Sequence, residues 1–220
     1  MIFEELSVLY EQEPHPAALN MAIDEVLLRK IDAPLLRLYR WSRPSVSFGY
    51  FGKFDEVREA WPSRDWVRRW TGGGIVPHGE DVTYSVIVPR RDPFAHLNPL
   101  ESYERIHKAV AAALAAAGEN VQLAAAASHK VSEACFENPC QHDIIASGQK
   151  VAGAAQRRTQ FGLLHQGSIQ ANGVSEKTRE RLAEVMSSRL LTYSLSMEDI
   201  KAAKSLAAEK YECEEWLKRF

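Results

Sequence analysis

Lys150 and Cys135 are the two side chains whose types and spacing best suit chemistry on a substrate. Lys150 begins a run of small residues, Val151-Ala152-Gly153-Ala154-Ala155, which leaves room for a ligand to lie against a strand. A lysine fixed on such a strand can present its cation to an acyl oxygen, and a nearby thiol can accept the acyl group. The pair therefore predicts acyl-group chemistry.

Both residues also have ordinary explanations. A lysine just after a turn often extends its ammonium into solvent, and a free cysteine is usually a small buried hydrophobe. The polar loop around Cys135 favours a nucleophile, because a reactive thiolate needs solvent access and nearby positive charge. Cys140 is a rival nucleophile in the same stretch, whereas Cys213 has a helical context and is interpreted as structural.

A zinc site is a further alternative for this stretch. Cys135, Cys140 and His142 could supply three ligands, with His129 or His165 as the fourth. This spacing matches no standard two-pair zinc pattern, so the sequence favours the absence of a metal site.

Gly72, Gly73 and Gly74 form a triple-glycine run between Arg69 and His78. Without side chains, their backbone N–H groups can approach a ligand closely, and Arg69 can recognise a carboxylate or phosphate. The alternative is a flexible hairpin tip with solvated arginines. The run is not a phosphate-binding P-loop, because no Lys-Ser/Thr pair follows at the required spacing, and it does not fit a dinucleotide fingerprint.

Two histidines, His78 and His165, follow apolar residues near glycine or proline segments and could face the same pocket. A lone histidine is more often a hydrogen-bonded structural residue, so both alternatives remain.

The composition limits the class of protein. The chain has 220 residues, 45% hydrophobic and 25% charged, which is typical of a globular protein with one large core. Its net charge of -2 indicates no surface for nucleic acid or anionic membranes. The acidic start, Met1-Ile2-Phe3-Glu4-Glu5, is unlike a signal peptide, and an odd number of cysteines argues against a disulfide framework. We expect a cytoplasmic protein with a single domain over residues 1–220.

Hydrophobic periodicity predicts the elements that must position these residues. Helices are predicted over Ala17–Lys30, over Tyr103–Ala117, from an N-cap at Ser175 through Met186, and over Met197–Ala208 and Cys213–Lys218. Strands are predicted over residues 5–10, Leu35–Tyr39, Ser45–Phe48, Asp65–Trp70, Val82–Val88, Asp143–Ala146, Gln149–Gln156 and Gly162–Gln170. This mixture predicts an α/β or α+β fold with a mixed central sheet flanked by helices.

Strand alternation makes a specific prediction for the lysine segment. It would place Lys150, Ala152 and Ala154 on one face of a strand, and Val151 and Gly153 on the other.

Taken together, the motifs resemble the biotin/lipoate protein ligase and octanoyltransferase superfamily over most of residues 17–170. The resemblance is carried, in order, by Asn20-Met21-Ala22-Ile23-Asp24-Glu25, Leu36-Arg37-Leu38-Tyr39-Arg40-Trp41 with Ser45-Val46-Ser47-Phe48-Gly49, Arg68-Arg69-Trp70-Thr71-Gly72-Gly73-Gly74 with Val76 and His78, Thr83-Tyr84-Ser85, and Gly148-Gln149-Lys150-Val151-Ala152-Gly153. It implies a fold similar to the catalytic domain of biotin protein ligase and to class II aminoacyl-tRNA synthetases.

Within this superfamily the sequence is most similar to the octanoyltransferases. Cys135-Phe136-Glu137-Asn138-Pro139 resembles the Cys-Phe-x-x-Pro segment of the cysteine-loop octanoyltransferases, which lipoate ligases generally lack. Two features depart from that pattern: the third glycine, Gly74, is more ligase-like, and Gly52 stands where the family has glutamine.

The resemblance implies transfer of an octanoyl or lipoyl group, in lipoate biosynthesis, from acyl carrier protein to a lysine of a lipoyl domain. The acceptors would be glycine cleavage H protein or dehydrogenase E2 subunits. Cys135 would hold the acyl group as a thioester, Lys150 would stabilise the oxyanion, and no cofactor would be needed. The acyl pocket would be lined by Arg69, Gly72, Gly73, Gly74, His78, Gly153, Ala155, His165 and Gly167.

Two alternatives differ in class. One is a lipoate-protein ligase that uses ATP and Mg²⁺ to form an acyl-adenylate. The other is a non-catalytic protein that binds an acyl group or a lipoyl domain.

Overall fold

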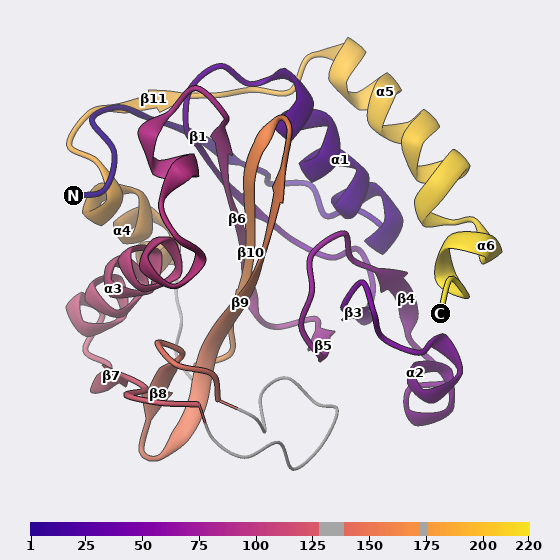
Figure 1. Ribbon diagram of the computed structural model, residues 1–220, viewed down its shortest axis with the longest axis horizontal. Coiled ribbons are helices and arrows are strands. Elements are labelled where there is room, and N and C mark those ends of the chain that lie inside the picture. The colour runs from indigo at the N-terminus through magenta and orange to yellow at the C-terminus, as the bar shows by residue number, and fades with distance from the viewer. Residues whose placement is uncertain (128–138, 172–175) are drawn as a thin grey trace.

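A large mixed sheet runs through the centre of the protein (Figure 1). The structure is a computed structural model that describes residues 1–127, 139–171 and 176–220. The strands of the large sheet are β1 (Leu6–Tyr10), β2 (Leu35–Tyr39), β6 (Val82–Pro89), β7 (Val121–Leu123), β8 (Ile144–Ala146), β9 (Gln149–Thr159), β10 (Gly162–Ile169) and β11 (Leu190–Thr192). Their order is β11-β1-β2-β6-β10-β9-β8-β7. β1 pairs in parallel with β2 and β11, and the other neighbours are antiparallel.

A smaller sheet and the helices complete the described fold. The smaller sheet has the order β4-β3-β5, with β3 (Ser45–Phe48), β4 (Asp65–Arg68) and β5 (Ile75–His78). The helices are α1 (Ala17–Lys30), α2 (Phe54–Ala60), α3 (Pro99–Ala116), α4 (Glu176–Met186), α5 (Met197–Leu206) and α6 (Glu214–Leu217), with a 3-10 turn at Pro93–His96 and a π-helical turn at Ala207–Tyr211.

Two helical layers cover opposite faces of the large sheet: α3 and α4 pack together on one face, and α1 and α5 on the other (Figure 1). Strand β6 contributes to both hydrophobic cores. Val86 and Val88 pack in the cluster with Ile106 of α3, whereas Ile87 packs in the cluster with Leu27 of α1. Successive side chains of a strand point to opposite faces, which explains this division. Each fully buried aliphatic side chain stabilises the fold by about 1.5–3 kcal/mol relative to an exposed one.

The fold class is confirmed, and so is the helix at Ala17–Lys30. The predicted start of the next helix at Tyr103 was four residues too late, because α3 begins at Pro99. The Asn98 side chain accepts a hydrogen bond of 2.8 Å from the Glu101 backbone N–H, and proline suits the first turn of a helix. The pair Asn98-Pro99 is a helix-start signal in the sequence, and the prediction missed it because it was based on apolar periodicity alone.

Four short elements were missed in the sequence: α2, β5, β7 and β11. Strand β11 illustrates why. Leu190 and Leu191 are 39% and 43% exposed, so the strand has no alternation of buried and exposed positions and depends on parallel pairing with β1. The predicted N-cap Ser175 lies outside the described residues.

Within the described parts of the chain, none of the helices combines the length and apolar character that crossing a bilayer requires. That residues 1–220 form one catalytic domain stays a prediction.

Candidate active site

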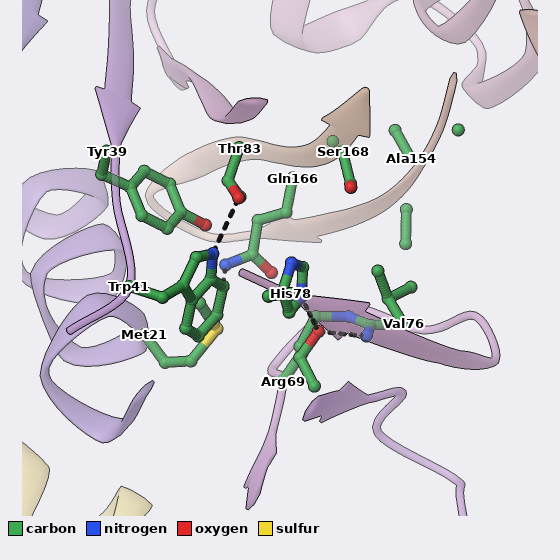
Figure 2. A pocket seen from close by; sticks show the side chains of 14 residues that line it. Met21, Tyr39, Trp41, Arg69, Val76, His78, Thr83, Ala154, Gln166 and Ser168 are labelled. Carbon is green, nitrogen blue, oxygen red and sulfur yellow. Dashed lines mark hydrogen bonds between the residues drawn. The ribbon is translucent and has the colours of Figure 1, made fainter. Parts of the chain in front are cut away.

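A pocket of about 410 Å³, its open mouth included, lies on the face of the large sheet that carries α1. Residues from both sheets and from α1 surround it. Figure 2 shows Met21, Tyr39 and Trp41 grouped at one end and Ala154 and Ser168 at the other. The lining residues are Met21, Tyr39, Trp41, Ser47, Arg69, Val76, His78, Thr83, Gly153, Ala154, Ala155, Gln166, Gly167 and Ser168. A concave site with apolar walls and a few placed polar groups is the usual form of a small-ligand site.

Arg69 shapes the glycine loop beside this pocket. Its guanidinium donates to the carbonyl oxygens of Gly72 at 2.9 Å and Gly74 at 3.0 Å. Gly73 has a φ of +89°, a conformation that favours glycine. A Cβ on Gly49 would lie 1.9 Å from the Gly73 carbonyl oxygen. The glycines of this region therefore allow two backbone segments to touch, and Arg69 holds the loop in place.

His78 links two elements of the pocket wall. Its Nε2 atom lies 2.6 Å from the Ser47 hydroxyl, and its Nδ1 atom lies 2.8 Å from Asp81 Oδ2. The Thr83 and Ser168 hydroxyls also donate to Asp81 Oδ2, each at 2.7 Å. Burial favours a neutral Asp81, but His78 and these hydrogen bonds outweigh burial and lower the pKa of Asp81 to about 2. These polar groups satisfy one another, so an apolar chain can lie against them without leaving a donor or acceptor unpaired.

Trp41 covers the imidazole of His78. The two rings stack with centroids 4.1 Å apart and planes inclined by 16°. The Trp41 indole N–H donates to the Thr83 hydroxyl at 2.8 Å, as the dashed line in Figure 2 shows. The indole thus presents an apolar surface to the pocket while its one polar atom is paired.

Gln166 joins the pocket to a buried charge network. Its side-chain amide donates to Asp24 Oδ2 at 2.7 Å and accepts from the Thr71 hydroxyl at 2.8 Å. The other oxygen of Asp24 accepts from Arg37, at 2.7 Å, and both side chains are 0% exposed. Removing one partner of a buried ion pair is strongly destabilising. Thr71, which directly precedes the three glycines, is therefore held by Gln166 and, through it, by the buried Asp24–Arg37 ion pair.

Lys150 lies at the edge of the pocket, beside Gly153. Its side chain is 1% exposed, and its Nζ atom lies 2.8 Å from Asp143 Oδ2. A Cβ on Gly153 would lie 2.3 Å from Lys150 Cε and 2.6 Å from Nζ. The absence of a side chain at Gly153 is what allows the lysine to lie against this wall of the pocket.

A β-bulge explains why the predicted alternation was wrong at Lys150. Ile145 of β8 pairs with Lys150, and Ile144 pairs with Ala152, so β9 carries one extra residue between them. One extra residue reverses the faces of the residues that follow. Lys150 therefore shares a face with Gly153, not with Ala152.

Only some of the residues that the sequence predicted for the acyl pocket line the pocket in the structure. Arg69, His78, Gly153, Ala155 and Gly167 line the pocket. The three loop glycines are not among its lining residues, and Lys150 contacts the pocket through Gly153. The predicted nucleophile, Cys135, lies outside the described residues.

The expected position of His165 in the pocket wall needs correction. Its neighbour on β10, Gln166, lines the pocket, and alternation turns His165 to the α3 face, where it is 0% exposed. There its ring lies 5.5 Å from that of His107 and its Nδ1 atom 3.1 Å from the Gln156 amide nitrogen. Burial lowers the pKa of His165 well below its usual value.

Gly167 lines the pocket only with its backbone. A Cβ at this position would lie 2.2 Å from Cζ of Tyr84 on the opposite face of the sheet. The glycine is therefore required by the packing of Tyr84 and not by the pocket.

Several residues of the site had no assigned role in the sequence: Met21, Trp41, Ser47, Gln166, Asp81 and Asp143. Asp143 had the clearest signal, since it stands seven positions before Lys150 at the start of the predicted hairpin. The others come from elements distant in the sequence, and only the folded sheet places them together.

Only some of the residues considered as zinc ligands lie in the part of the chain that the structure describes. Cys140 is exposed, whereas Cys135 and His129 lie outside the described residues. In the ranges 1–127, 139–171 and 176–220, no three His, Cys, Asp or Glu side chains are grouped to hold a metal ion.

Comparison with known proteins is informative at the levels of family and fold. The model of the lipoyl protein ligase A/B catalytic domain matches residues 16–206. The octanoyltransferase LipM of Oceanobacillus iheyensis is 36% identical over 168 residues, covering 72% of this chain and 62% of that protein. The LipM of Carboxydothermus hydrogenoformans is 31% identical, covering 91% of this chain and 94% of that protein. The chain thus spans less than two thirds of the first relative and nearly all of the second.

Solved structures agree with the fold. A protein from T. acidophilum with bound lipoic acid superposes with a TM-score of 0.79 at 22% identity, over 100% of both chains. Lipoate-protein ligase A bound with ATP gives a TM-score of 0.76 at 21% identity, over 99% of this chain and 98% of that one. At these identities the likeness concerns the fold alone.

Proposed function

The chain belongs to the lipoyl protein ligase A/B catalytic domain family, and we propose that it is an octanoyltransferase that acts in protein lipoylation. The observation that carries the proposal is the position of Lys150, whose ammonium lies against Gly153 in the wall of a pocket with apolar sides. The relatives named octanoyltransferase, at 36% and 31% identity, support the same activity.

The proposed reaction has two steps. The thiolate of Cys135 attacks the carbonyl carbon of an octanoyl thioester on acyl carrier protein, the carbon–sulfur bond of the donor breaks, and the carrier thiol leaves. The amine of a lipoyl-domain lysine then attacks the Cys135 thioester, forms an amide, and releases the Cys135 thiol. Exchange between thioesters is nearly balanced in free energy, so the reaction needs neither ATP nor Mg²⁺.

Lys150 has an electrostatic role in this scheme. A cation held in a buried position interacts strongly with an oxyanion, because little solvent screens the charge. Beside the tetrahedral intermediate of either step, the Lys150 ammonium stabilises the negative oxygen and favours the thiolate form of Cys135. The acyl chain extends from there along the pocket, past Val76, toward Met21 and Trp41.

The test is the intact mass of the protein after incubation with octanoyl-acyl carrier protein in the absence of ATP. We expect a gain of one octanoyl group that hydroxylamine removes and that Cys135→Ala abolishes. Cys140→Ser is the matched control, because Cys140 is an exposed cysteine in the same stretch. A Cys135→Ala protein that transfers octanoate as fast as wild type would contradict the mechanism.

Two outcomes would move the protein to another class. Acylation of a lipoyl domain by free octanoate or lipoate, only with ATP and Mg²⁺, would identify a lipoate-protein ligase. Binding of octanoate without a covalent adduct and without transfer would identify a binding protein.

A further inference from the structure

Asp143 and Tyr103 form a buried polar group behind Lys150, outside the pocket lining. We propose that Asp143, oriented by Tyr103, is the positioning residue that fixes Lys150 and the backbone next to the segment that carries Cys135. This inference rests on the proposed function, and its experiment separates the two.

Both oxygens of the Asp143 carboxylate accept hydrogen bonds from neighbouring residues. The residue is 0% exposed. Its Oδ2 atom accepts from the Lys150 ammonium at 2.8 Å and from the backbone N–H of Cys140 at 2.6 Å. Its own backbone N–H donates to the Cys140 carbonyl at 3.0 Å. One carboxylate therefore connects the lysine with the turn that follows residues 128–138.

Tyr103 holds the second carboxylate oxygen from helix α3. Its hydroxyl donates to Asp143 Oδ1 at 2.5 Å and accepts from the backbone N–H of Ala154 at 3.0 Å. Ala154 lines the pocket. Burial and the nearby Asp143 raise the pKa of Tyr103 well above its usual value, so the phenol keeps its proton and remains a donor. The Tyr103 hydroxyl thereby connects helix α3 both to Asp143 and to strand β9 of the pocket wall.

This arrangement restricts both the position and the charge of Lys150. A long lysine side chain ordinarily has several rotamers, but an anion held from three sides restrains its ammonium. An ammonium in a buried position without a partner loses its proton more easily, and the Asp143 carboxylate opposes that loss. Held in this way, the Lys150 ammonium lies against Gly153 in the pocket wall, where it can meet a substrate oxygen. Asp143 does not line the pocket, so we infer that it acts on the reaction through Lys150.

The experiment compares Asp143→Asn and Tyr103→Phe in octanoyl transfer to a lipoyl domain over a range of pH. We expect Asp143→Asn to lower kcat by about 100-fold, the lower end of the range for the loss of an oxyanion-stabilising donor, because Lys150 stays present but is no longer held in place. We expect the alkaline limit of kcat to move to lower pH, because Lys150 loses its anion. Tyr103→Phe keeps the ring and removes one hydrogen bond, so a decrease of about 10-fold with little change in KM is expected.

Two matched controls lie outside the pocket. Asp199→Asn changes a carboxylate that caps α5, and Tyr193→Phe removes another partly buried hydroxyl. Both should retain the kcat and the pH profile of wild type. Asp143→Asn with the kcat and pH profile of wild type would overturn the proposal.

Chemical labelling of Lys150 tests the positioning role of Asp143 without relying on enzymatic turnover. Limited acetylation with acetic anhydride, followed by peptide mass spectrometry, reports the fraction of Lys150 that reacts at each pH. In a folded Asp143→Asn protein, confirmed by thermal unfolding, we expect Lys150 to react at lower pH than in wild type. An unchanged labelling profile would overturn the positioning role, whereas a wild-type protein without acyl transfer would overturn the proposed function alone.

Discussion

Gly153 and Gly167 lie on neighbouring strands of the same pocket wall, in adjacent pairs of the β9–β10 ladder. A Cβ on Gly153 would strike Lys150 at 2.3 Å, on the pocket side of the sheet. A Cβ on Gly167 would strike Tyr84 at 2.2 Å, on the α3 side. The first glycine makes room for a group that can act on a substrate, and the second makes room for the hydrophobic core.

The two sides of the sheet differ in how their polar groups are paired. On the pocket side, Asp81 and Arg69 bind neighbouring residues with charge-assisted hydrogen bonds that leave the pocket shaped before any ligand arrives. On the α3 side, His107 and His165 are 0% exposed, and their rings lie 5.5 Å apart. Substitutions that move pocket groups should change catalysis, and substitutions that disturb the packing of Tyr84, His107 and His165 should change stability.

The largest expected effect is that of Gly153→Ala. The added methyl group must displace Lys150, and the loss of one preorganised electrostatic group reduces rates by about 100- to 1,000-fold. We expect octanoyl transfer to fall within that range, with a smaller loss of stability than in Gly167→Ala, because the methyl group meets the end of a flexible side chain. Gly79→Ala is the matched control, because the nearest atom to its Cβ would be 4.0 Å away. A large loss of stability in Gly153→Ala would remove the contrast between the two glycines.

Gly167→Ala should act on stability. The methyl group would overlap the Tyr84 ring, and overpacking of a core costs about 1–3 kcal/mol. We expect a loss near the upper end of that range in chemical denaturation, with catalysis per folded molecule retained. The double variant Gly167→Ala, Tyr84→Leu should recover part of the loss, because the shorter side chain leaves the space that the methyl group needs. Loss of catalysis without loss of stability would contradict this assignment.

Acid should weaken the α3 side through its buried histidines. Burial lowers the pKa of His107 to about 4, from an ordinary value of 6.5. The unfolded chain therefore binds a proton between these values that the folded protein does not, so His107 stabilises the fold fully above pH 6.5 and less as the pH falls toward 4. The expected loss between pH 6.5 and pH 5 is about 2 kcal/mol.

Denaturation of His107→Gln at the same two pH values checks this expectation. The variant should be less sensitive to acid than wild type, since glutamine does not titrate there. His96→Gln, at an exposed position, should retain the wild-type sensitivity. Equal sensitivity of wild type and His107→Gln would show that another group causes the acid response.

The smallest effect is expected for Gly72→Ala. No atom lies within 4 Å of the Cβ that this change would add, and Gly72 is not among the pocket-lining residues. Surface substitutions of this kind change stability by no more than about 0.5 kcal/mol, and we expect KM for the octanoyl donor to remain near that of wild type. A marked rise in KM would mean that the glycine loop contacts the acyl chain, as the sequence motif predicts.

Local patterns in the sequence predicted the elements that are long or strongly periodic. The apolar stripe from Leu19 to Leu27 predicted the bounds of α1, but its buried face is only partly the predicted one. Asn20, Asp24 and Glu25 are buried as well, because they bind partners in the polar network that the sequence did not reveal. The glycine run and the lysine segment were both found from residue types alone. Short elements such as β7 and β11 were missed because three residues carry too little periodicity, and their pairing with distant strands determines them.

Residue identities determined which groups are available for chemistry: a lysine among small residues, a loop cysteine, a glycine run and a histidine within a family motif. Only the tertiary structure decided which of them meet. The bulge in β9 turned Lys150 toward Gly153, alternation along β10 turned His165 away from the pocket, and the fold brought Tyr103 of α3 to Asp143. The physical reason is that side-chain type is a local property, whereas the face of a strand and the partner of a buried charge depend on register and packing between distant segments.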